Sequence, residues 1–200
     1  MSPARTGSGA GGIVLETIRS RRVTRSFTDA PVSDEHVRLL LEAARWAPSS
    51  GNRYINKLVV VRNPSTITLI KPFCPGVLGT PTLMLAICTD AQKGAAEQVQ
   101  LDKDRSVWID IGMIAMNVMI AAHALGLGAC PATSFSRSAV SAILELPEWL
   151  TPDFIVQLGH PAAVTRVMRP GVRSRLSVEE MTYWERYATT ANPSDTATKP

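Results

Sequence analysis

Apolar and polar residues alternate along this chain with the period of a helix in several separate segments. In residues 33–47 the apolar side chains recur every three or four positions, which predicts an amphipathic helix. Ser33 can cap its first turn, and Pro48 is expected to end it. Similar but shorter patterns predict further helices at residues 13–20, 64–73, 137–146 and 177–187.

The longest helical segment, residues 105–127, is apolar on nearly every face. A helix of this kind is buried in a core or in an interface, so we expect a second subunit to cover part of it. Asp110, Asn117 and His123 interrupt the apolar run, which argues against a membrane span. Short continuous apolar runs predict buried strands at residues 57–61, 82–89 and 153–159.

Helices and strands therefore alternate, and no signal for a tight hairpin is present. This order predicts a mixed α/β or α+β layer fold. Residues 1–12 are rich in Gly, Ser and Ala, and residues 188–200 are polar, so both ends are predicted to be flexible tails. Between them, residues 13–187 are long enough for one sizeable domain.

Composition narrows the class of function. The chain is 45% hydrophobic, carries a net charge of +4 and is only 6% aromatic, which disfavours a nucleic-acid-binding protein. Its three cysteines are widely spaced, with no CxxC pair, so neither a disulfide framework nor a metal site is expected. The first residues lack the apolar core of a signal peptide, and a reducing, cytoplasmic location without a membrane is predicted.

Three segments have chemistry suited to a phosphorylated, planar ligand. Four arginines lie within residues 19–25, and Arg173 and Arg175 lie two apart in a predicted loop; guanidinium groups bind phosphate in pairs. Residues 125–135 combine glycines, which let backbone approach a ligand, with Pro131. Each segment also has a plainer interpretation: a solvated helix end, a solvated loop and a helix stop.

Other residues indicate no reaction of their own. Ser49 and Ser50 have no base nearby in the sequence, and Cys130 fits a small buried residue better than a reactive thiol. The three histidines lack metal-ligand spacing. No catalytic side chain is therefore assigned.

Together these segments resemble the nitroreductase family of flavin enzymes. The resemblance lies in an ordered set covering about residues 13–187: "RRVTRSF", "AARWAPSSGN", "NVMIAAHALGLGACP", "IVQLGHPA" and the closing "RSR". It implies an α+β sandwich with a mixed central sheet flanked by helices, and a homodimer with FMN at the interface. The long apolar helix would contribute to the dimer.

The resemblance also implies a cofactor site. Arg21, Arg173 and Arg175 would hold the FMN phosphate, Arg22 would line the ribityl side, and Arg25 would lie at N1 and O2 of the flavin. Residues 48–52 would come from the partner subunit, and residues 131–134 would pass near N5. Carried over by motif, the cofactor-binding residues are Arg21, Arg22, Val23, Arg25, Pro48, Ser49, Ser50, Asn52, Pro131, Ala132, Thr133, Ser134, Arg173 and Arg175.

The implied activity is ping-pong hydride transfer from NAD(P)H through FMN to a nitroaromatic, quinone-like or related planar acceptor. The flavin carries the redox chemistry, which agrees with the lack of an assigned catalytic side chain. Three departures from the family pattern concern the edge of the site and thus the substrate: Val23 replaces a frequent serine, Arg53 begins a changed segment after Asn52, and Thr133-Ser134 replaces a frequent Glu-Gly pair.

Two alternatives stay open. Residues 73–90 and 126–135 look similar to the larger subunit of cyclodipeptide oxidases, flavin enzymes that desaturate cyclic dipeptides with oxygen and need a small partner subunit. The changed residues 53–56 also allow a flavin-binding or partner-binding protein without turnover.

Overall fold

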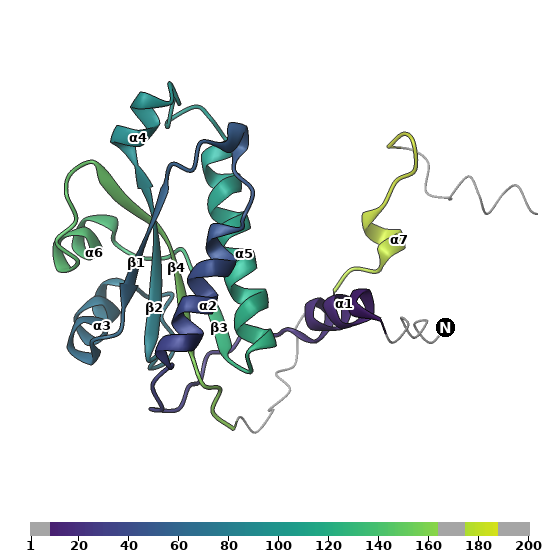
Figure 1. The fold of residues 1–200 in the computed structure, drawn as a ribbon, viewed down its shortest axis with the longest axis horizontal. Coiled ribbons are helices and arrows are strands. Elements are labelled where there is room, and N and C mark those ends of the chain that lie inside the picture. The colour runs from purple at the N-terminus through teal and green to yellow at the C-terminus, as the bar shows by residue number, and fades with distance from the viewer. Residues whose placement is uncertain (1–8, 164–174, 188–200) are drawn as a thin grey trace, which may run out of the picture. The chain divides into compact units, whose positions relative to one another are not determined.

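The computed structural model describes residues 9–163 and 175–187 (Figure 1). They belong to two compact units, divided between residues 164 and 165, and each unit is described by itself. The second unit contains one short helix, α7 (Val178–Met181). In chain order the first contains α1 (Ala10–Ser20), α2 (Asp34–Arg45), η1 (Ser50–Asn52), β1 (Asn56–Val61), α3 (Pro64–Ile70), η2 (Lys71–Phe73), β2 (Leu83–Asp90), α4 (Ala91–Ala96), α5 (Ser106–Ala124), β3 (Gly128–Ala132), α6 (Arg137–Ile143) and β4 (Leu150–Gly159).

The strands of the first unit form one four-stranded sheet in the order β1-β2-β4-β3. All three ladders are antiparallel. The expected mixed sheet is therefore corrected in detail: parallel pairing among the described residues is a single bridge between Val23 and Ala129. The segment that makes this bridge is too short to form a ladder, because only Val23 and Thr24 follow β3 closely.

Helices cover both faces of the sheet. Alternate residues of β2 explain this arrangement: Leu83, Leu85 and Ile87 pack in one apolar cluster with α2 and α5, whereas Met84 and Ala86 pack in another with α3 and α6. All eight residues of β2 are buried, which confirms the buried strand predicted there. A strand covered on both faces reads as a continuous apolar run.

The predicted helices near the start of the chain are confirmed. The Oγ of Ser33 accepts a hydrogen bond from the backbone N–H of His36 and so caps α2. In the second unit, Ser177 and Glu180 form the reciprocal hydrogen bonds of a capping box. The helix they begin is shorter than predicted, since α7 ends at Met181.

Four elements differ from what the sequence predicted. β1 is not a buried strand but an edge of the sheet, and only Val61 in it is buried. No strand is predicted at residues 128–132, where β3 forms the opposite edge of the sheet; an edge strand tolerates Pro131. The short helix α4 gives no clear periodic pattern and was missed. α1 begins at Ala10, inside the segment predicted to be a tail.

By length and composition α5 could cross a membrane. In this fold it instead contributes a buried face to the core, where it packs against α2 and the sheet. The side chain of Asn117 in α5 donates a hydrogen bond to the carbonyl oxygen of Ala43 in α2, at 3.1 Å. The opposite face is apolar and exposed, as Ile109, Met113 and Met116 illustrate.

Candidate functional site

The arginine-rich segment 21–27 leaves the end of α1 and follows the edge strand β3. The N–H of Arg21 closes α1 by bonding to the carbonyl oxygen of Thr17. Beyond it, the N–H of Thr24 donates to the carbonyl oxygen of Ala129 at 2.9 Å. This contact and the neighbouring bridge through Val23 keep the segment against β3. The sheet thus provides a rigid support for the arginines.

The arginines of this segment have different surroundings. Arg21 is half-buried, and Arg25 is exposed. Arg22 turns back onto the backbone, where its Nη1 donates to the carbonyl oxygens of Arg19 at 2.6 Å and of Arg21 at 2.9 Å. Burial raises the pKa of the Cys130 thiol, and the positive charge of Arg25 partly opposes that shift. Arg25 therefore lies near β3, on the side of Cys130.

β3 continues into the exposed residues Thr133 and Ser134, after the half-buried Pro131 and the buried Ala132. The carbonyl oxygen of Ser134 accepts a hydrogen bond from the N–H of Gly76 at 3.1 Å. Gly76 in turn accepts one from Nε2 of the fully buried Gln157, at 2.9 Å. The segment around Gly76, which is itself bound by Gln157 of β4, thus holds the turn after β3. The structure brings residues 131–134 and the arginine segment to the same edge of the sheet.

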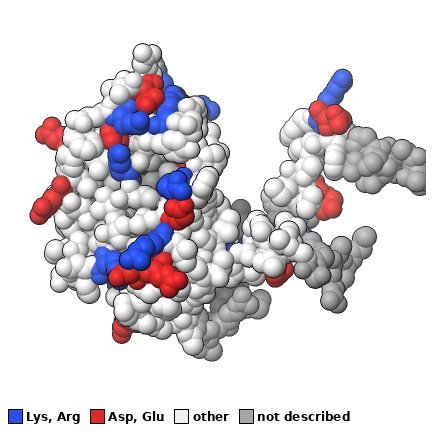
Figure 2. Space-filling model, in the orientation of Figure 1, with Lys and Arg blue, Asp and Glu red and all other residues white. Residues whose placement is uncertain are grey.

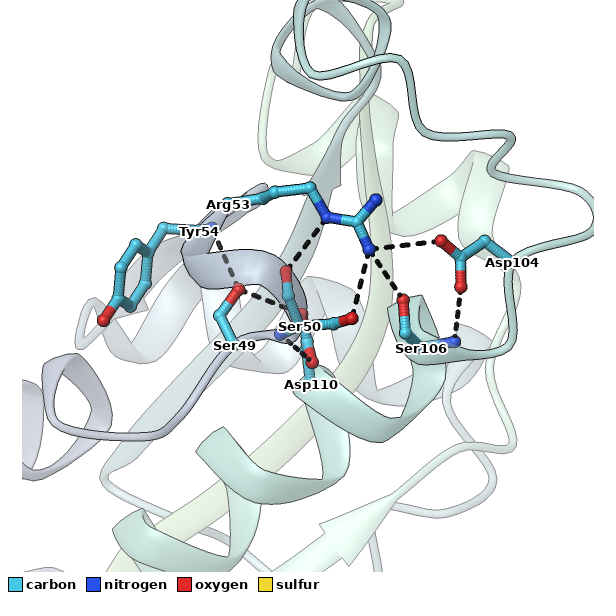
Figure 3. A network of polar contacts seen from close by, with 7 residues as sticks. All are labelled: Ser49, Ser50, Arg53, Tyr54, Asp104, Ser106 and Asp110. Carbon is cyan, nitrogen blue, oxygen red and sulfur yellow. Dashed lines mark hydrogen bonds and ion pairs between the residues drawn. The ribbon is translucent and has the colours of Figure 1, made fainter.

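The loop between α2 and β1 forms a second group, shown in Figure 3. Its organising residue is Asp110, a buried carboxylate in the first turns of α5. The Oγ of Ser49 donates to Oδ2 of Asp110 at 3.1 Å, and the N–H of Ser50 donates to Oδ1 at 3.0 Å. Arg53 closes the other side of the loop through Asp104, with an ion pair of 3.2 Å.

The sequence alone did not reveal this network. Asp110 lies 60 residues from Ser50 in the chain. Its only sequence signal is a carboxylate within an otherwise apolar helix, a placement that calls for buried donors. Arg53 was noted only as a departure from a motif, and Asp104 and Ser106 were not considered. The predicted residues Pro48 and Asn52 are exposed beside the network.

A cavity of about 500 Å³ lies beside this loop. Apolar side chains from α2, β1 and α5 form part of its wall, and the exposed aromatic residues Trp46 and Tyr54 contribute to it. Pro48 and Ser49 also border it. Ser49 and Tyr54 therefore belong both to the Asp110 network and to the wall of this cavity.

The two groups of predicted residues lie at opposite ends of α5. Asp110 holds the loop near the beginning of the helix, whereas His123, near its end, hydrogen-bonds Ser20 just before the arginine segment at 2.9 Å. Thirteen residues of α-helix at 1.5 Å each separate the two points by about 20 Å. One chain therefore does not bring residues 48–52 to the arginines. Figure 1 shows the same separation along α5.

The remaining predicted residues lie elsewhere. Arg173 is outside the described residues, and Arg175 is exposed in the second unit. On the face drawn in Figure 2, lysines and arginines are interspersed with acidic residues. In residues 9–163 and 175–187 no three His, Cys, Asp or Glu side chains come together as a metal site would need. All three cysteines are buried and free.

A family model described as "Nitroreductase family" matches residues 18–78 and 70–160, well over half of the chain. The chain belongs to the nitroreductase family. The structure agrees: the Vibrio harveyi NADPH:FMN oxidoreductase, solved in complex with NAD⁺, superimposes with a TM-score of 0.72 at 26% identity, over 92% of this chain and 82% of that one.

Two curated relatives fit the same family. The Salmonella typhimurium oxygen-insensitive NADPH nitroreductase is 27% identical over 86% of this chain and 74% of its own length. The Bacillus subtilis FMN reductase [NAD(P)H] is 26% identical over 87% of this chain and 74% of its own. This protein is accordingly an FMN-dependent oxidoreductase of the nitroreductase family, with the α+β fold expected from its sequence.

Proposed function

We propose that this nitroreductase-family protein is a homodimer that binds FMN at the subunit interface and transfers electrons from NAD(P)H to a small planar acceptor. The observation that carries the proposal is the separation along α5. Residues 48–52 and the arginine segment are held at points of α5 about 20 Å apart along the helix, so a site that uses both needs two chains.

The exposed face of α5 supports the dimer. Ile109, Met113 and Met116 are each between 39% and 53% exposed, on a helix whose other face is in the core. Contiguous apolar residues on a protein surface favour an interface. α1 contributes further exposed apolar residues, among them Ile13 and Val14. A second copy covering this face would also place the two ends of α5 from different chains within one site.

The donors at the edge of β3 fit FMN. Guanidinium groups are the side chains best suited to hold a phosphate in a bidentate way, and three arginines reach this edge. In the proposed site Arg21, with Arg173 and Arg175, holds the phosphate, Arg22 lines the ribityl chain and Arg25 lies at the pyrimidine edge. Val23 borders the ribityl side without a hydroxyl, and residues 131–134 border N5.

Each residue group has a separate task in this proposal. The arginines bind and orient the cofactor, the turn after β3 limits its position, and Pro48, Ser49, Ser50 and Asn52 complete the site from the partner subunit. FMN, when bound, supplies the redox chemistry, accepting a hydride from NAD(P)H and delivering it to the acceptor in a ping-pong cycle. The relatives' names favour nitro compounds and flavin as acceptors. Quinone-like acceptors are a further class that we propose from the resemblance in sequence.

Two finer hypotheses remain proposals with less support. The similarity of residues 73–90 to cyclodipeptide oxidases would give a biosynthetic oxidase with a small partner subunit, but the relatives named above are reductases. A flavin-binding protein without turnover would need the changed loop at Arg53 to block the acceptor. Three free cysteines fit a reducing, cytoplasmic location.

The direct test is to purify the protein, record its absorption spectrum and measure oxidation of NADH and NADPH with menadione or a nitroaromatic compound. We expect flavin absorption with one FMN per chain and turnover with at least one donor. A yellow protein that oxidises neither donor would overturn the reductase assignment. Turnover of cyclic dipeptides by the protein with a small partner would favour the oxidase.

Replacement of Arg21 tests the site itself. Arg21→Ala removes a charge-assisted contact to phosphate of about 1.5–3 kcal/mol, so the Kd for FMN should rise by about ten- to a hundredfold. Arg19→Ala is the matched control, since Arg19 is an exposed residue in the last turn of α1. Isothermal titration of the apoprotein with FMN measures both. Equal affinity in Arg21→Ala and the wild type would show that Arg21 does not hold the phosphate.

A further inference from the structure

The backbone of the loop at residues 49–54 is held in an unusual conformation. Gly51, Asn52 and Tyr54 have φ values of 61°, 58° and 48°. Residues other than glycine seldom adopt a positive φ. Such a backbone conformation persists only where surrounding contacts impose it. The contacts that impose it here come from two anchors: Asp110, which binds Ser49 and Ser50, and Arg53, which binds Ser50 (Figure 3).

The first anchor takes up the single proton of the Ser49 hydroxyl. That hydroxyl donates to Oδ2 of Asp110 at 3.1 Å and accepts the N–H of Tyr54 at 2.9 Å. A serine hydroxyl has only one proton to donate, and here a buried carboxylate takes it. Asp110 also accepts the N–H of Ser50. Ser49 is therefore a link within the loop, with no proton left for a ligand.

In the second anchor the hydroxyl of Ser50 accepts a hydrogen bond and does not donate one. Nη2 of Arg53 donates to Oγ of Ser50 at 3.2 Å, while Nε donates to the carbonyl oxygen of the same residue at 2.9 Å. A guanidinium only donates hydrogen bonds, so Oγ of Ser50 is the acceptor in this contact. Its proton has no acceptor among the described residues.

Arg53 is itself fixed at the beginning of α5. Its Nη2 also contacts Oδ2 of Asp104 at 3.2 Å and Oγ of Ser106 at 3.1 Å. Hydrogen bonds from Ser106, together with Arg53, keep the pKa of Asp104 below its ordinary value, so the carboxylate is charged at neutral pH. The orientation of Ser50 thus depends on α5 through both anchors.

We propose that Asp110 and Arg53 are positioning residues that present the hydroxyl of Ser50 as a hydrogen-bond donor to an acceptor atom of the FMN held by the partner subunit, and that the hydroxyl of Ser49 donates no hydrogen bond to the cofactor. This inference rests on the proposed function. It assigns the donated hydrogen bond to Ser50 and a role within the loop to Ser49.

Double-mutant cycles on the Kd for FMN test it. Ser50→Ala should raise the Kd about two- to tenfold, the size of one hydrogen bond. Asp110→Asn and Ser49→Ala should each raise the Kd by no more than Ser50→Ala does, because Asp110 and Ser49 affect FMN only through the position of Ser50. Combined with Ser50→Ala, neither should raise the Kd further, since the contact they support is already absent.

Asp102→Asn is the matched control, an exposed acidic residue close to the beginning of α5 that should leave the Kd unchanged. Should Asp110→Asn fail to fold, Arg53→Lys enters the same cycle, because a lysine cannot contact both oxygens of Ser50 as the guanidinium does. Thermal melting of each apoprotein separates a loss of folding from a loss of binding.

Additive effects of Asp110→Asn and Ser50→Ala would show that Asp110 has only a structural role and would overturn the inference. An unchanged Kd in Ser50→Ala, or additive effects of the two serine variants, would overturn it as well. In each of these cases the wild type still binds FMN, and the proposed function stands. A wild type that does not bind FMN overturns the proposed function and this inference with it.

Discussion

Cys88 has no exposed surface and faces the carboxylate of Asp153 across the sheet. Burial and, to a smaller extent, the charge of Asp153 raise the pKa of its thiol to about 12. The carboxylate is held in place by Oγ1 of Thr89 at 2.6 Å and by Nε of Arg137 at 3.1 Å. An ionised thiol is therefore excluded from the folded state until strongly alkaline pH.

This shift predicts an alkaline loss of stability. Because the pKa of the folded state lies above the value of 9.0 for a free thiol, the contribution is complete below pH 9 and is lost as the pH rises toward about 12. Between pH 8 and 10 the unfolding free energy should fall by about 1 kcal/mol through this residue. Urea denaturation of the wild type and of Cys88→Ala at both pH values measures it; equal slopes with pH in the two proteins would contradict it.

At the scale of elements, the position of the arginine segment depends on a close approach to residue 79. A Cβ added at Gly79 would overlap the carbonyl oxygen of Arg25. Because the added Cβ would meet backbone and not a flexible side chain, the arginine segment would have to move as a whole. Glycine at this position thus lets the arginines lie against the fold next to β3.

Gly79→Ala should accordingly weaken FMN binding without touching the cofactor. We expect the Kd for FMN to rise about tenfold, since displacement of Arg25 and its neighbours loses charge-assisted contacts. Gly11→Ala in α1, where an added Cβ meets nothing within 4 Å, is the matched control and should not affect binding. Fluorescence titration with FMN compares the two; tight binding by Gly79→Ala would show that the segment tolerates the shift.

In the whole molecule as we propose it, one chain provides two incomplete halves of a site. α5 separates them, and the same helix presents the apolar face on which a second copy can pack. Assembly and cofactor binding should therefore be coupled: what disrupts the contact along α5 should also release FMN.

Ile109→Asp tests this coupling. A charge placed at a residue that is 53% exposed in one chain and covered in the dimer should dissociate the subunits and raise the Kd for FMN by about tenfold or more. Leu69→Asp, at an exposed apolar residue of α3, should alter neither. Light scattering gives the oligomeric state, and equilibrium dialysis gives the Kd. A monomer that still binds FMN tightly would contradict a shared site.

Much of this protein was determined by its sequence alone. Helical periodicity predicted α2, the long apolar segment predicted α5, the continuous apolar run predicted β2, and Ser33 predicted the cap of α2, because these features depend on residues close together in the chain. The ordered motifs indicated the nitroreductase family, since a combination of distant short patterns is far more specific than any single one.

Only the tertiary structure decided which strands are edges and what the serines do. The sequence did not reveal that β1 and β3 are edge strands, because the burial of a strand depends on neighbours that a local pattern does not contain. Ser49 and Ser50 look equivalent in the sequence, yet Asp110 and Arg53 give their hydroxyls opposite orientations. Those partners come from α5 and from the turn of the loop itself, so the difference between the two serines arises only when the chain has folded.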